Sequence, residues 1–551
     1  MTYTIEKVTT LIGARRYGDN DTNIGFILTD SRSLCFPEET LFFALKSERN
    51  DGHNYIPELY RRGVKNFVVT DVPKGYASDY PEANFLKVVN TLEALQRLAE
   101  RHRDEFNIPI VGITGSNGKT MVKEWLYQLL SPSMFVTRSP RSYNSQIGVP
   151  LSVWLMNEQT QVGVFEAGIS QPGEMLALRD IIQPTIAVLT NVGSAHQENF
   201  SSLEEKCREK LILFHDAETV VYDGDDEVIT KVVAEYPDYK GEKLFWSLQN
   251  PEAPFYVKKI EKQQSVSVIT YIYKGVEDSF SIPFIDDASI QNSIICAAVA
   301  SKIGLSAEDI DKRMALLEPV AMRLEVKVGQ HGCTLINDSY NSDINSLDIA
   351  LDFMNRRPDH RGRRHTLILS DIYQSGQTPE ALYKEVSDLA RKRGVVKFIG
   401  IGPELCKQHD TIQISEKFFF PNVEEFINSE VFASLRDEVI LLKGARQFGF
   451  DQLTELLVQK VHETTLEVNL NAVVANLNYY RAFMKPETKL VCMIKADGYG
   501  AGAVEIAKTL QDHRVDYLAV AVADEGVTLR KNGITSNIMI MNPEMTAFKT
   551  M

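Results

Sequence analysis

The segment Gly-Ile-Thr-Gly-Ser-Asn-Gly-Lys-Thr at residues 112–120 has the residue types that bind the phosphates of a nucleotide. Glycines let successive backbone N–H groups point at one anion, and a helix that starts directly after the loop directs its N-terminus at the phosphates. Lys119 can then reach the β- and γ-phosphates, and the Thr120 hydroxyl can bind Mg²⁺. The usual Gly-x4-Gly-Lys-Ser/Thr spacing is shifted by one position, because Ile113 stands where that spacing has its first glycine. The segment predicts ATP and Mg²⁺ binding; the alternative is a glycine-rich turn without a ligand.

The elements around this loop are those that such a site needs. Residues 110–113 are an apolar run typical of a buried strand, and residues 121–126 have the apolar periodicity of a helix. Further apolar strands are expected at 162–165 and 186–190. Strands that alternate with helices predict a doubly wound, mainly parallel α/β sheet. Residues 255–285 alternate apolar and polar side chains, which predicts antiparallel strands appended to that sheet.

Composition and charge limit the classes of partner. The chain has 551 residues, a formal net charge of −15 at pH 7 and a pI of about 5.3. This negative charge argues against nucleic acid or an anionic membrane surface as a partner. No apolar run reaches the about 18 residues of a spanning helix, and no basic region precedes an apolar run at the N-terminus, so we expect neither membrane insertion nor a signal peptide. The six cysteines are scattered without a Cys-x-x-Cys pair, which argues against disulfides and zinc and fits a cytoplasmic protein.

Motif order divides the chain into four expected units. Residues 1–105 precede the strand of the phosphate loop, and residues 106–320 contain the loop and its sheet. Residues 321–462 predict another α/β unit, and residues 463–551 form a last piece. The apolar strands of the third unit are expected at 334–336, 366–369 and 439–442.

Four motifs, in this order, resemble the Mur ligase family, whose members form amide bonds with ATP during peptidoglycan assembly. Residues 114–120 resemble the family's phosphate loop, and residues 143–150 resemble its Asn-Asn-x-Ile-Gly-x-Pro segment with one asparagine replaced by serine. Glu166 ends a strand, as the family's Mg²⁺-binding glutamate does. His196 lies in a match to Asn-x-x-x-Ala-His, whose histidine binds a second Mg²⁺. The resemblance implies three domains: an N-terminal UDP-substrate domain, a central ATP-binding domain and a C-terminal Rossmann-like domain.

The resemblance also implies roles for individual residues. Lys210 resembles the lysine that is carbamylated in many Mur ligases to give a metal an oxygen ligand; the alternative is a solvent-exposed helix lysine. Arg323, Asp338 and Asn292 resemble residues at the phosphate, ribose and adenine of ATP. The implied catalytic residues are Lys119, Glu166, His196 and Lys210, and the implied metal ligands are Thr120, Glu166, His196 and Lys210. The implied ATP-binding residues are Gly115, Ser116, Asn117, Gly118, Lys119, Thr120, Asn292, Arg323 and Asp338. The implied substrate-binding residues are Ser31, Arg32, Asn144, Tyr340 and Asn341.

The implied chemistry is ATP-dependent amide formation through an acyl phosphate. Residues 30–32, 42–46 and 51–53 resemble the uridine-nucleotide-binding domain of the two last-acting ligases. Residues 338–343 resemble the Asp-Ser-Tyr-Asn-Ala-Asn of the D-alanyl-D-alanine-adding type, with Asp for the last Asn. The resemblance therefore implies UDP-MurNAc-tripeptide and D-Ala-D-Ala as substrates, and a monomeric ligase. The alternatives are a MurE-like or folylpolyglutamate-synthase-like ligase, and a non-catalytic nucleotide-binding scaffold.

A second signature, Met-Ile-Lys-Ala-Asp-Gly-Tyr-Gly at residues 493–500, resembles the start of alanine racemase. There the lysine forms a Schiff base with pyridoxal phosphate and the tyrosine helps to bind its phosphate, which implies these roles for Lys495 and Tyr499. Residues 515–521 fit the next strand of the β/α barrel. A barrel needs about 250 residues, so we expect an incomplete, inactive racemase segment that would bind the cofactor and dimerise only if complete. The alternative is a structural appendage.

Overall fold

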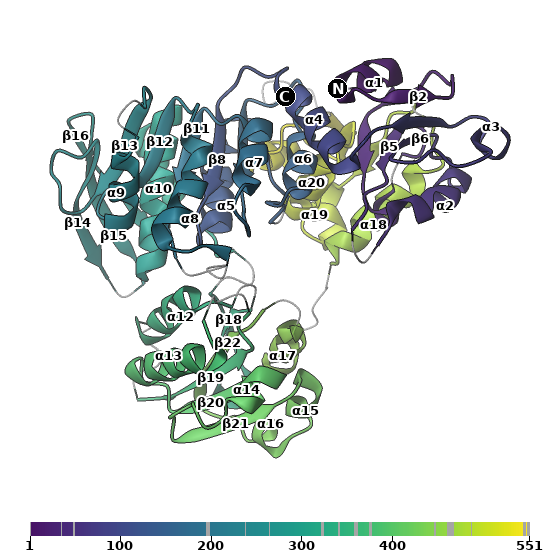
Figure 1. Cartoon of the computed structure of the whole chain (residues 1–551). Helices are drawn as coiled ribbons and strands as arrows, with labels where there is room; N and C mark the ends of the chain where they lie inside the picture. The colour runs from purple at the N-terminus through teal and green to yellow at the C-terminus, as the bar shows by residue number, and fades with distance from the viewer. Residues whose placement is uncertain are drawn as a thin grey trace.

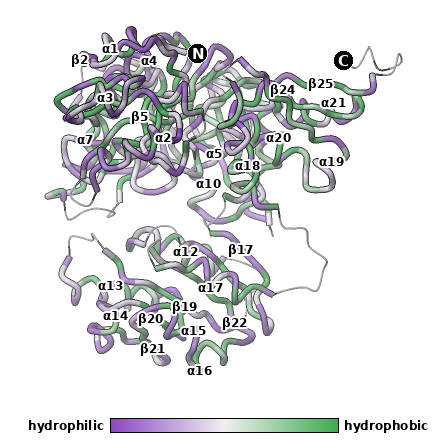
Figure 2. Tube along the Cα trace, turned by 90° about the vertical axis from the view of Figure 1, so that its right-hand side faces the viewer, coloured by the Kyte–Doolittle hydropathy of each residue, from purple (hydrophilic) through white to green (hydrophobic). Residues whose placement is uncertain are grey.

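Four units, each with a sheet of three or more strands and attached helices, follow one another along the chain in the computed structural model (Figure 1). In both views the third of these units lies below the other three (Figures 1 and 2). Among the described residues, no helix is long and apolar enough to cross a membrane. The structure describes residues 2–34, 36–47, 50–140, 142–193, 199–236, 239–263, 265–320, 324–339, 342–356, 362–373, 377–445, 448–459, 468–485, 487–543 and 547.

The first unit is a five-stranded sheet in the order β2-β7-β6-β5-β4. Neighbours from β4 to β7 are parallel, and β2 is antiparallel to β7. The strands are β2 (Arg15–Tyr17), β4 (Phe26–Leu28), β5 (Thr40–Phe43), β6 (Asn66–Val69) and β7 (Asn84–Lys87), beside a ribbon of β1 (Tyr3–Thr4) and β3 (Asn23–Ile24). The helices are α1 (Ile5–Ile12), α2 (Ile56–Arg61), α3 (Tyr76–Asp79) and α4 (Thr91–Arg103).

The second unit is a nine-stranded sheet in the order β16-β15-β14-β13-β12-β11-β8-β10-β9. Its strands are β8 (Ile110–Thr114), β9 (Val136–Arg138), β10 (Val162–Glu166), β11 (Ile186–Leu189), β12 (Thr219–Asp223), β13 (Glu242–Ser247), β14 (Phe255–Lys262), β15 (Ser267–Tyr273) and β16 (Val276–Ile282). Pairing is parallel across the sheet from β9 to β14 and antiparallel from β14 through β15 to β16. The predicted antiparallel strands at 255–285 are therefore present, but β14 also pairs parallel with β13.

Helices cover both faces of this second sheet. One core contains side chains of α5 (Lys119–Leu130), α10 (Asp287–Ile303) and α11 (Ala307–Met314). The other core contains side chains of α6 (Gly148–Val153), α7 (Glu174–Ile182), α8 (Leu203–Leu211) and α9 (Glu227–Ala234). Neighbouring residues of β8 belong to different cores, Ile110 to the second and Val111 to the first, because successive strand side chains point to opposite faces. The doubly wound α/β prediction is confirmed.

The third unit is a six-stranded sheet in the order β17-β18-β22-β19-β20-β21, parallel except for β17. Three of its strands confirm the apolar runs in the sequence. The strands are β17 (Glu325–Val328), β18 (Thr334–Asp338), β19 (Arg364–Ser370), β20 (Lys397–Ile401), β21 (Glu416–Phe420) and β22 (Glu438–Lys443). The helices are α12 (Ile344–Arg356), α13 (Pro379–Lys392), α14 (Pro403–Lys407), α15 (Val423–Ile427), α16 (Glu430–Ala433) and α17 (Phe450–Leu457).

The last unit has three parallel strands, and it packs against the first two units. The guanidinium of Arg481 lies 4.7 Å from the centre of the Phe36 ring, and Arg514 forms a hydrogen bond to Trp154. The elements are α18 (Leu470–Arg481), β23 (Val491–Met493), α19 (Lys495–Gly500), α20 (Ala503–Asp512), β24 (Tyr517–Val520), α21 (Ala523–Lys531) and β25 (Asn537–Ile540). Strands alternating with helices agree with the barrel-type segment that the sequence predicts.

Candidate active site

A cavity of about 440 Å³ lies next to the loop between β8 and α5. Its lining includes the whole predicted phosphate loop, residues 115–120, and the predicted residues Asn144 and Lys210. Residues from the turn after β10 complete it, among them Gly168 and Ser170. The strand ends of the parallel sheet therefore bring together residues that are far apart in sequence.

The phosphate loop needs its glycines for steric reasons. Gly115 has a φ of +145°, and a Cβ there would lie 1.9 Å from Oγ1 of Thr190. Gly118 has a φ of +82°, and a Cβ there would lie 2.6 Å from Oδ1 of Asn292. Only glycine fits both the positive φ and the close approach of these neighbours. Asn292, which the resemblance assigns to adenine, thus abuts the loop from α10.

Hydrogen bonds fix the loop to the segment after β11. The Asn191 carbonyl accepts from the Ser116 N–H at 3.0 Å, and its Oδ1 accepts from the Asn117 N–H at 2.9 Å. Nζ of Lys119 donates to the Gly115 carbonyl at 2.6 Å, which keeps the ammonium over the loop. Helix α5 begins at Lys119 without a side-chain cap, so its first N–H groups are directed at the cavity, as in an anion site.

Glu166 lies behind the loop, fully buried at the end of β10. Its Oε2 accepts hydrogen bonds from the Thr120 hydroxyl at 3.2 Å and from Nδ2 of Asn144 at 3.4 Å. Its Oε1 lies 3.2 Å from Nζ of Lys123, a fully buried lysine on α5. Sequence reasoning missed Lys123; the signal was its position three residues after Thr120, on the same face of the helix.

These residues fit a Mg²⁺ ion that arrives with a nucleotide. Mg²⁺ takes oxygen ligands and is usually held by one or two protein groups together with phosphates and water. Thr120 and Glu166 supply oxygens around one point, where the Asn144 amide nitrogen donates to Glu166, and the Ser142 hydroxyl lies 3.2 Å from that of Thr120. Among the described residues, no group of three or more His, Cys, Asp or Glu could hold a metal by itself. The donor set therefore suits a Mg²⁺–nucleotide complex.

Lys210 is buried on α8 and lines the same cavity, which contradicts the alternative of a solvent-exposed lysine. Burial lowers its pKa well below the usual range, and the nearby charges of Lys119 and Lys206 lower it further. Burial also lowers the pKa of Lys206 to about 8. Within the described part of the chain, no carboxylate forms an ion pair with Lys210. Burial and the neighbouring cations therefore favour the neutral amine of Lys210 over its ammonium form.

The third unit contributes one described residue of the predicted nucleotide site. Asp338 lies at the end of β18, and its Oδ2 accepts from Nζ of Lys443 at 2.6 Å. It does not line the 440 Å³ cavity. The predicted residues His196, Arg323, Tyr340 and Asn341 lie outside the described residues.

A second cavity, of about 850 Å³, lies in the first unit and adjoins the phosphate-loop cavity. The predicted residues Ser31 and Arg32 line it. Leu92 and Ile147 line both cavities, so the two cavities adjoin at these side chains. The Arg32 guanidinium pairs with Asp30, which lowers the pKa of that carboxyl through hydrogen bonds.

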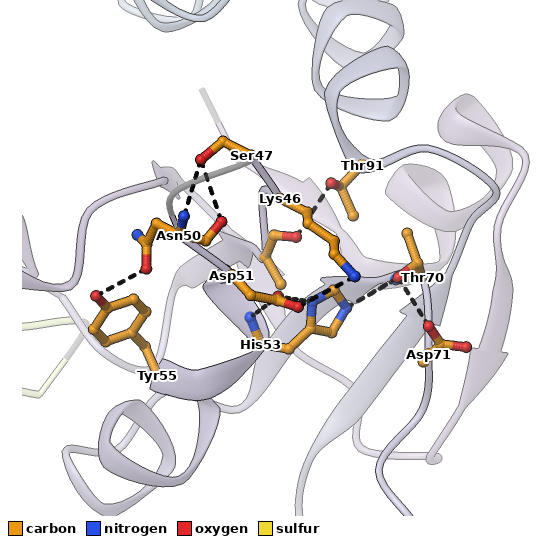
Figure 3. Close-up of polar contacts among 10 residues, drawn as sticks. Lys46, Ser47, Asn50, Asp51, His53, Tyr55, Thr70, Asp71 and Thr91 are labelled. Carbon is orange, nitrogen blue, oxygen red and sulfur yellow. Dashed lines mark hydrogen bonds and ion pairs between the residues drawn. The ribbon is translucent and has the colours of Figure 1, made fainter.

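A polar network shapes one wall of this second cavity (Figure 3). Nε2 of His53 accepts from the Thr70 N–H at 3.1 Å, so Nδ1 donates to Asp51 at 2.7 Å. Hydrogen bonds from His53 lower the pKa of Asp51. Oδ2 of that carboxylate lies 3.6 Å from Nζ of Lys46, which lines the cavity beside Tyr55. The site predictions omitted Lys46, although the motifs at 42–46 and 51–53 were recognised.

The predicted cofactor residues of the last unit do not fit bound pyridoxal phosphate. Lys495 and Tyr499 are both exposed, Tyr499 to 64%. Residues 496–499 have φ between +51° and +63°, a left-handed turn tied down by the Ala496 N–H bond to Glu525.

Comparisons with known proteins agree with this geometry. Residues 113–300 match the family described as the Mur ligase middle domain, and residues 468–550 match alanine racemase, N-terminal domain. The UDP-N-acetylmuramoyl-tripeptide–D-alanyl-D-alanine ligase of Bacillus subtilis (strain 168) is 29% identical over 371 residues, which cover 66% of this chain and 77% of that protein. The protein of the same name from Borreliella burgdorferi is 27% identical over 446 residues, 79% of this chain and 93% of that one.

Solved structures share the fold of the first three units. MurF from Acinetobacter baumannii superposes with a TM-score of 0.72 at 22% identity, covering 83% of this chain and 99% of its own. MurF ligase from Thermotoga maritima, in complex with ADP, has a TM-score of 0.66 at 22% identity, covering 78% and 96%. The predicted three-domain α/β fold class is thereby confirmed.

Proposed function

We propose that the chain is a member of the Mur ligase family with an attached segment of the alanine racemase N-terminal type, and that it is an ATP-dependent ligase that adds D-Ala-D-Ala to UDP-MurNAc-tripeptide in peptidoglycan precursor synthesis. The observation that supports this best is the pair of adjoining cavities that share Leu92 and Ile147. A substrate with a nucleotide at one end and a peptide carboxylate at the other can lie across both. The carboxylate then meets the γ-phosphate at the loop.

In the first step the peptide carboxylate attacks the γ-phosphorus of ATP, the bond to the bridging oxygen breaks, and ADP leaves. The backbone N–H groups at the start of α5 and the Lys119 ammonium stabilise the charge on the transferring phosphoryl group. We propose that Thr120 and Glu166 hold the Mg²⁺ of the nucleotide. When bound, that ion withdraws charge from the phosphate oxygens.

In the second step the amine of D-Ala-D-Ala attacks the carbonyl carbon of the acyl phosphate, and inorganic phosphate leaves. Water would hydrolyse this intermediate, so the site must close before the phosphoryl transfer. We propose that closure brings Asp338 and Arg323 of the third unit to the nucleotide. From the resemblance we propose that Tyr340 and Asn341 contact the substrate and that His196 binds a second metal ion.

We propose further that Lys210 acts as a carbamate. Its neutral amine adds to the carbon of CO₂ and loses one proton, which turns a cationic side chain into an anionic oxygen donor. The lowered pKa and the position in the cavity lining support this step. The carbamate would also neutralise the repulsion between Lys210 and its neighbours Lys119 and Lys206.

The test is phosphate release from ATP with UDP-MurNAc-tripeptide, with and without D-Ala-D-Ala, followed by the mass of the product. We expect release only with both substrates and a mass gain of one dipeptide. Lys119→Met should lower turnover by about 100-fold or more, and Lys74→Met, on the exposed surface of the first unit, is the matched control. Release that needs another amine, or none, would contradict the substrate assignment.

A further inference from the structure

Lys123 is a buried cation beside the phosphate loop that the proposed reaction does not use. Its side chain is fully buried in α5. Its Nζ lies 2.8 Å from Oε1 of Glu124 and 3.2 Å from Oε1 of Glu166, and it donates to the Ser139 carbonyl at 2.9 Å. Removing a charge from water costs free energy, which only close contacts with opposite charges and hydrogen-bond acceptors offset. The Lys123 ammonium therefore stays next to these partners.

The two carboxylate oxygens of Glu166 have different neighbours. Oε1 faces the Lys123 ammonium. Oε2 faces the Thr120 hydroxyl and the Asn144 amide, whose residues both line the cavity. Lys123 and Thr120 lie one turn apart on α5, so both contact the Glu166 carboxylate from the same side. The ammonium therefore decides which oxygen is directed towards the cavity.

The position of Lys123 is itself fixed from behind. Oε2 of Glu124 accepts from Nε of Arg138 at 3.1 Å, and the Arg138 guanidinium lies 3.6 Å from the centre of the Tyr127 ring. Ser139 connects Lys123 with Glu166. Its carbonyl accepts a hydrogen bond from Lys123, and its Oγ accepts one from the Glu166 N–H at 3.2 Å. The carboxylate has little freedom to rotate.

We propose that Lys123 is a positioning residue for the metal–nucleotide centre: it holds Oε1 of Glu166 so that Oε2, beside the Thr120 hydroxyl, is presented to the Mg²⁺ of the bound nucleotide. This inference rests on the proposed role of Glu166. Groups that orient a metal ligand typically change metal affinity or activity by about 10-fold to 100-fold. An ion pair that served folding alone would leave metal affinity unchanged.

The experiment measures Mn²⁺ binding by electron paramagnetic resonance, with the full chain and a non-hydrolysable ATP analogue. Lys123→Met should weaken Mn²⁺ binding to the nucleotide complex by about 10-fold or more, with unchanged analogue affinity in EDTA. Lys397→Met is the matched control, because Lys397 forms an equally buried pair with Glu438 in the third unit. The control should bind Mn²⁺ like the wild type.

A double-variant comparison separates positioning from a general loss of structure. If Lys123 acts through Glu166, the pair Lys123→Met with Glu166→Gln should bind Mn²⁺ no more weakly than Glu166→Gln alone. A folded Lys123→Met variant with wild-type Mn²⁺ affinity, or losses that simply add, would overturn the proposal. If Lys123→Met does not fold, Lys123→Arg is used in its place. The guanidinium keeps the charge but cannot place one nitrogen against the acceptors of Glu124, Glu166 and Ser139 together. Weaker Mn²⁺ binding is then expected, and unchanged Mn²⁺ binding would overturn the proposal.

This test does not require ligase turnover. A wild-type chain that binds Mn²⁺ with the analogue but joins no dipeptide would contradict the proposed function and leave the role of Lys123 measurable. If the wild-type chain joins the dipeptide but Lys123→Met has normal Mn²⁺ affinity, the positioning role of Lys123 is wrong and the proposed ligase function stands.

Discussion

The guanidinium of Arg514 donates a 3.0 Å hydrogen bond to the carbonyl oxygen of Trp154, and so fastens the racemase-related unit to the central one. The indole N–H of Trp154 donates in turn to the Gly25 carbonyl of the first unit, also at 3.0 Å. One tryptophan therefore connects three units. The last unit is part of the same packed body as the ligase core.

Arg514→Ala should loosen this attachment. A hydrogen bond from a charged donor contributes about 1.5–3 kcal/mol, and the free energy of local opening of the last unit should fall by about that amount. Hydrogen exchange of α20 measures it, because exchange reports opening of separate parts of a structure. Lys531→Ala, at the exposed end of α21, is the control. Unchanged exchange in α20 would mean that other contacts hold the unit in place.

Gly115→Ala should abolish nucleotide binding. The new Cβ would lie 1.9 Å from Oγ1 of Thr190 and would also have to accept a φ of +145°, so the loop must move. Gly173→Ala is the matched control, since Gly173 has a φ of +85° with nothing within 4 Å and adds backbone strain alone. Isothermal titration with ATP should show a loss of about 100-fold or more for Gly115→Ala, which is about 2.7 kcal/mol. Equal effects of both variants would show that strain, and not the clash, matters.

Activity should depend on dissolved CO₂ if Lys210 is carbamylated. Buffer depleted of CO₂ and bicarbonate should lower turnover, and added bicarbonate should restore it, because burial lowers the pKa of Lys210 and so favours the amine that reacts with CO₂. Lys210→Arg cannot form the carbamate and should be inactive at every bicarbonate concentration. Mass spectrometry under native conditions would show the added CO₂. A bicarbonate-independent wild type would contradict the carbamate.

His102 should make the protein sensitive to acid. Its Nε2 donates to the Met156 carbonyl at 3.1 Å, and its Nδ1 lies 2.9 Å from the Tyr3 hydroxyl. Burial lowers its pKa from 6.5 to about 3. Between these values the unfolded chain binds more protons than the folded one, so stability is present above pH 6.5 and falls as the pH drops towards 3, by at most about 1.4 kcal/mol per pH unit.

The measurement is urea denaturation of the wild type and of His102→Gln between pH 7 and pH 4. Other groups titrate as well, so the informative quantity is the difference between the two curves. The variant should be less stable at pH 7 but lose less stability on acidification. His409→Gln, on the exposed surface of the third unit, should follow the wild type. Parallel curves for the wild type and His102→Gln would refute this assignment.

Much of the fold follows from local patterns in the sequence. The apolar runs at 110–113, 162–165 and 186–190 became adjacent parallel strands β8, β10 and β11, because such runs are buried on both faces of a sheet. The glycines and the lysine of the phosphate loop were also recognisable, because strand, loop and helix follow one another directly in the sequence.

Contacts between distant segments could not be predicted in this way. The pairing of Lys123 with Glu166 depends on β10 lying next to β8, and no local pattern states the order of strands. The network of Asp51 and His53 was visible as a motif, but its partner Thr70 comes from the end of another strand. The contact of Arg514 with Trp154 joins residues 360 positions apart.

Because Leu92 and Ile147 line both cavities, a ligand that occupies the two cavities at once must run past these two side chains. Lys46 lines one cavity and Lys119 the other, so such a ligand would have one end beside each lysine. The length of the ligand, as well as its chemistry, would then decide whether it reaches both lysines.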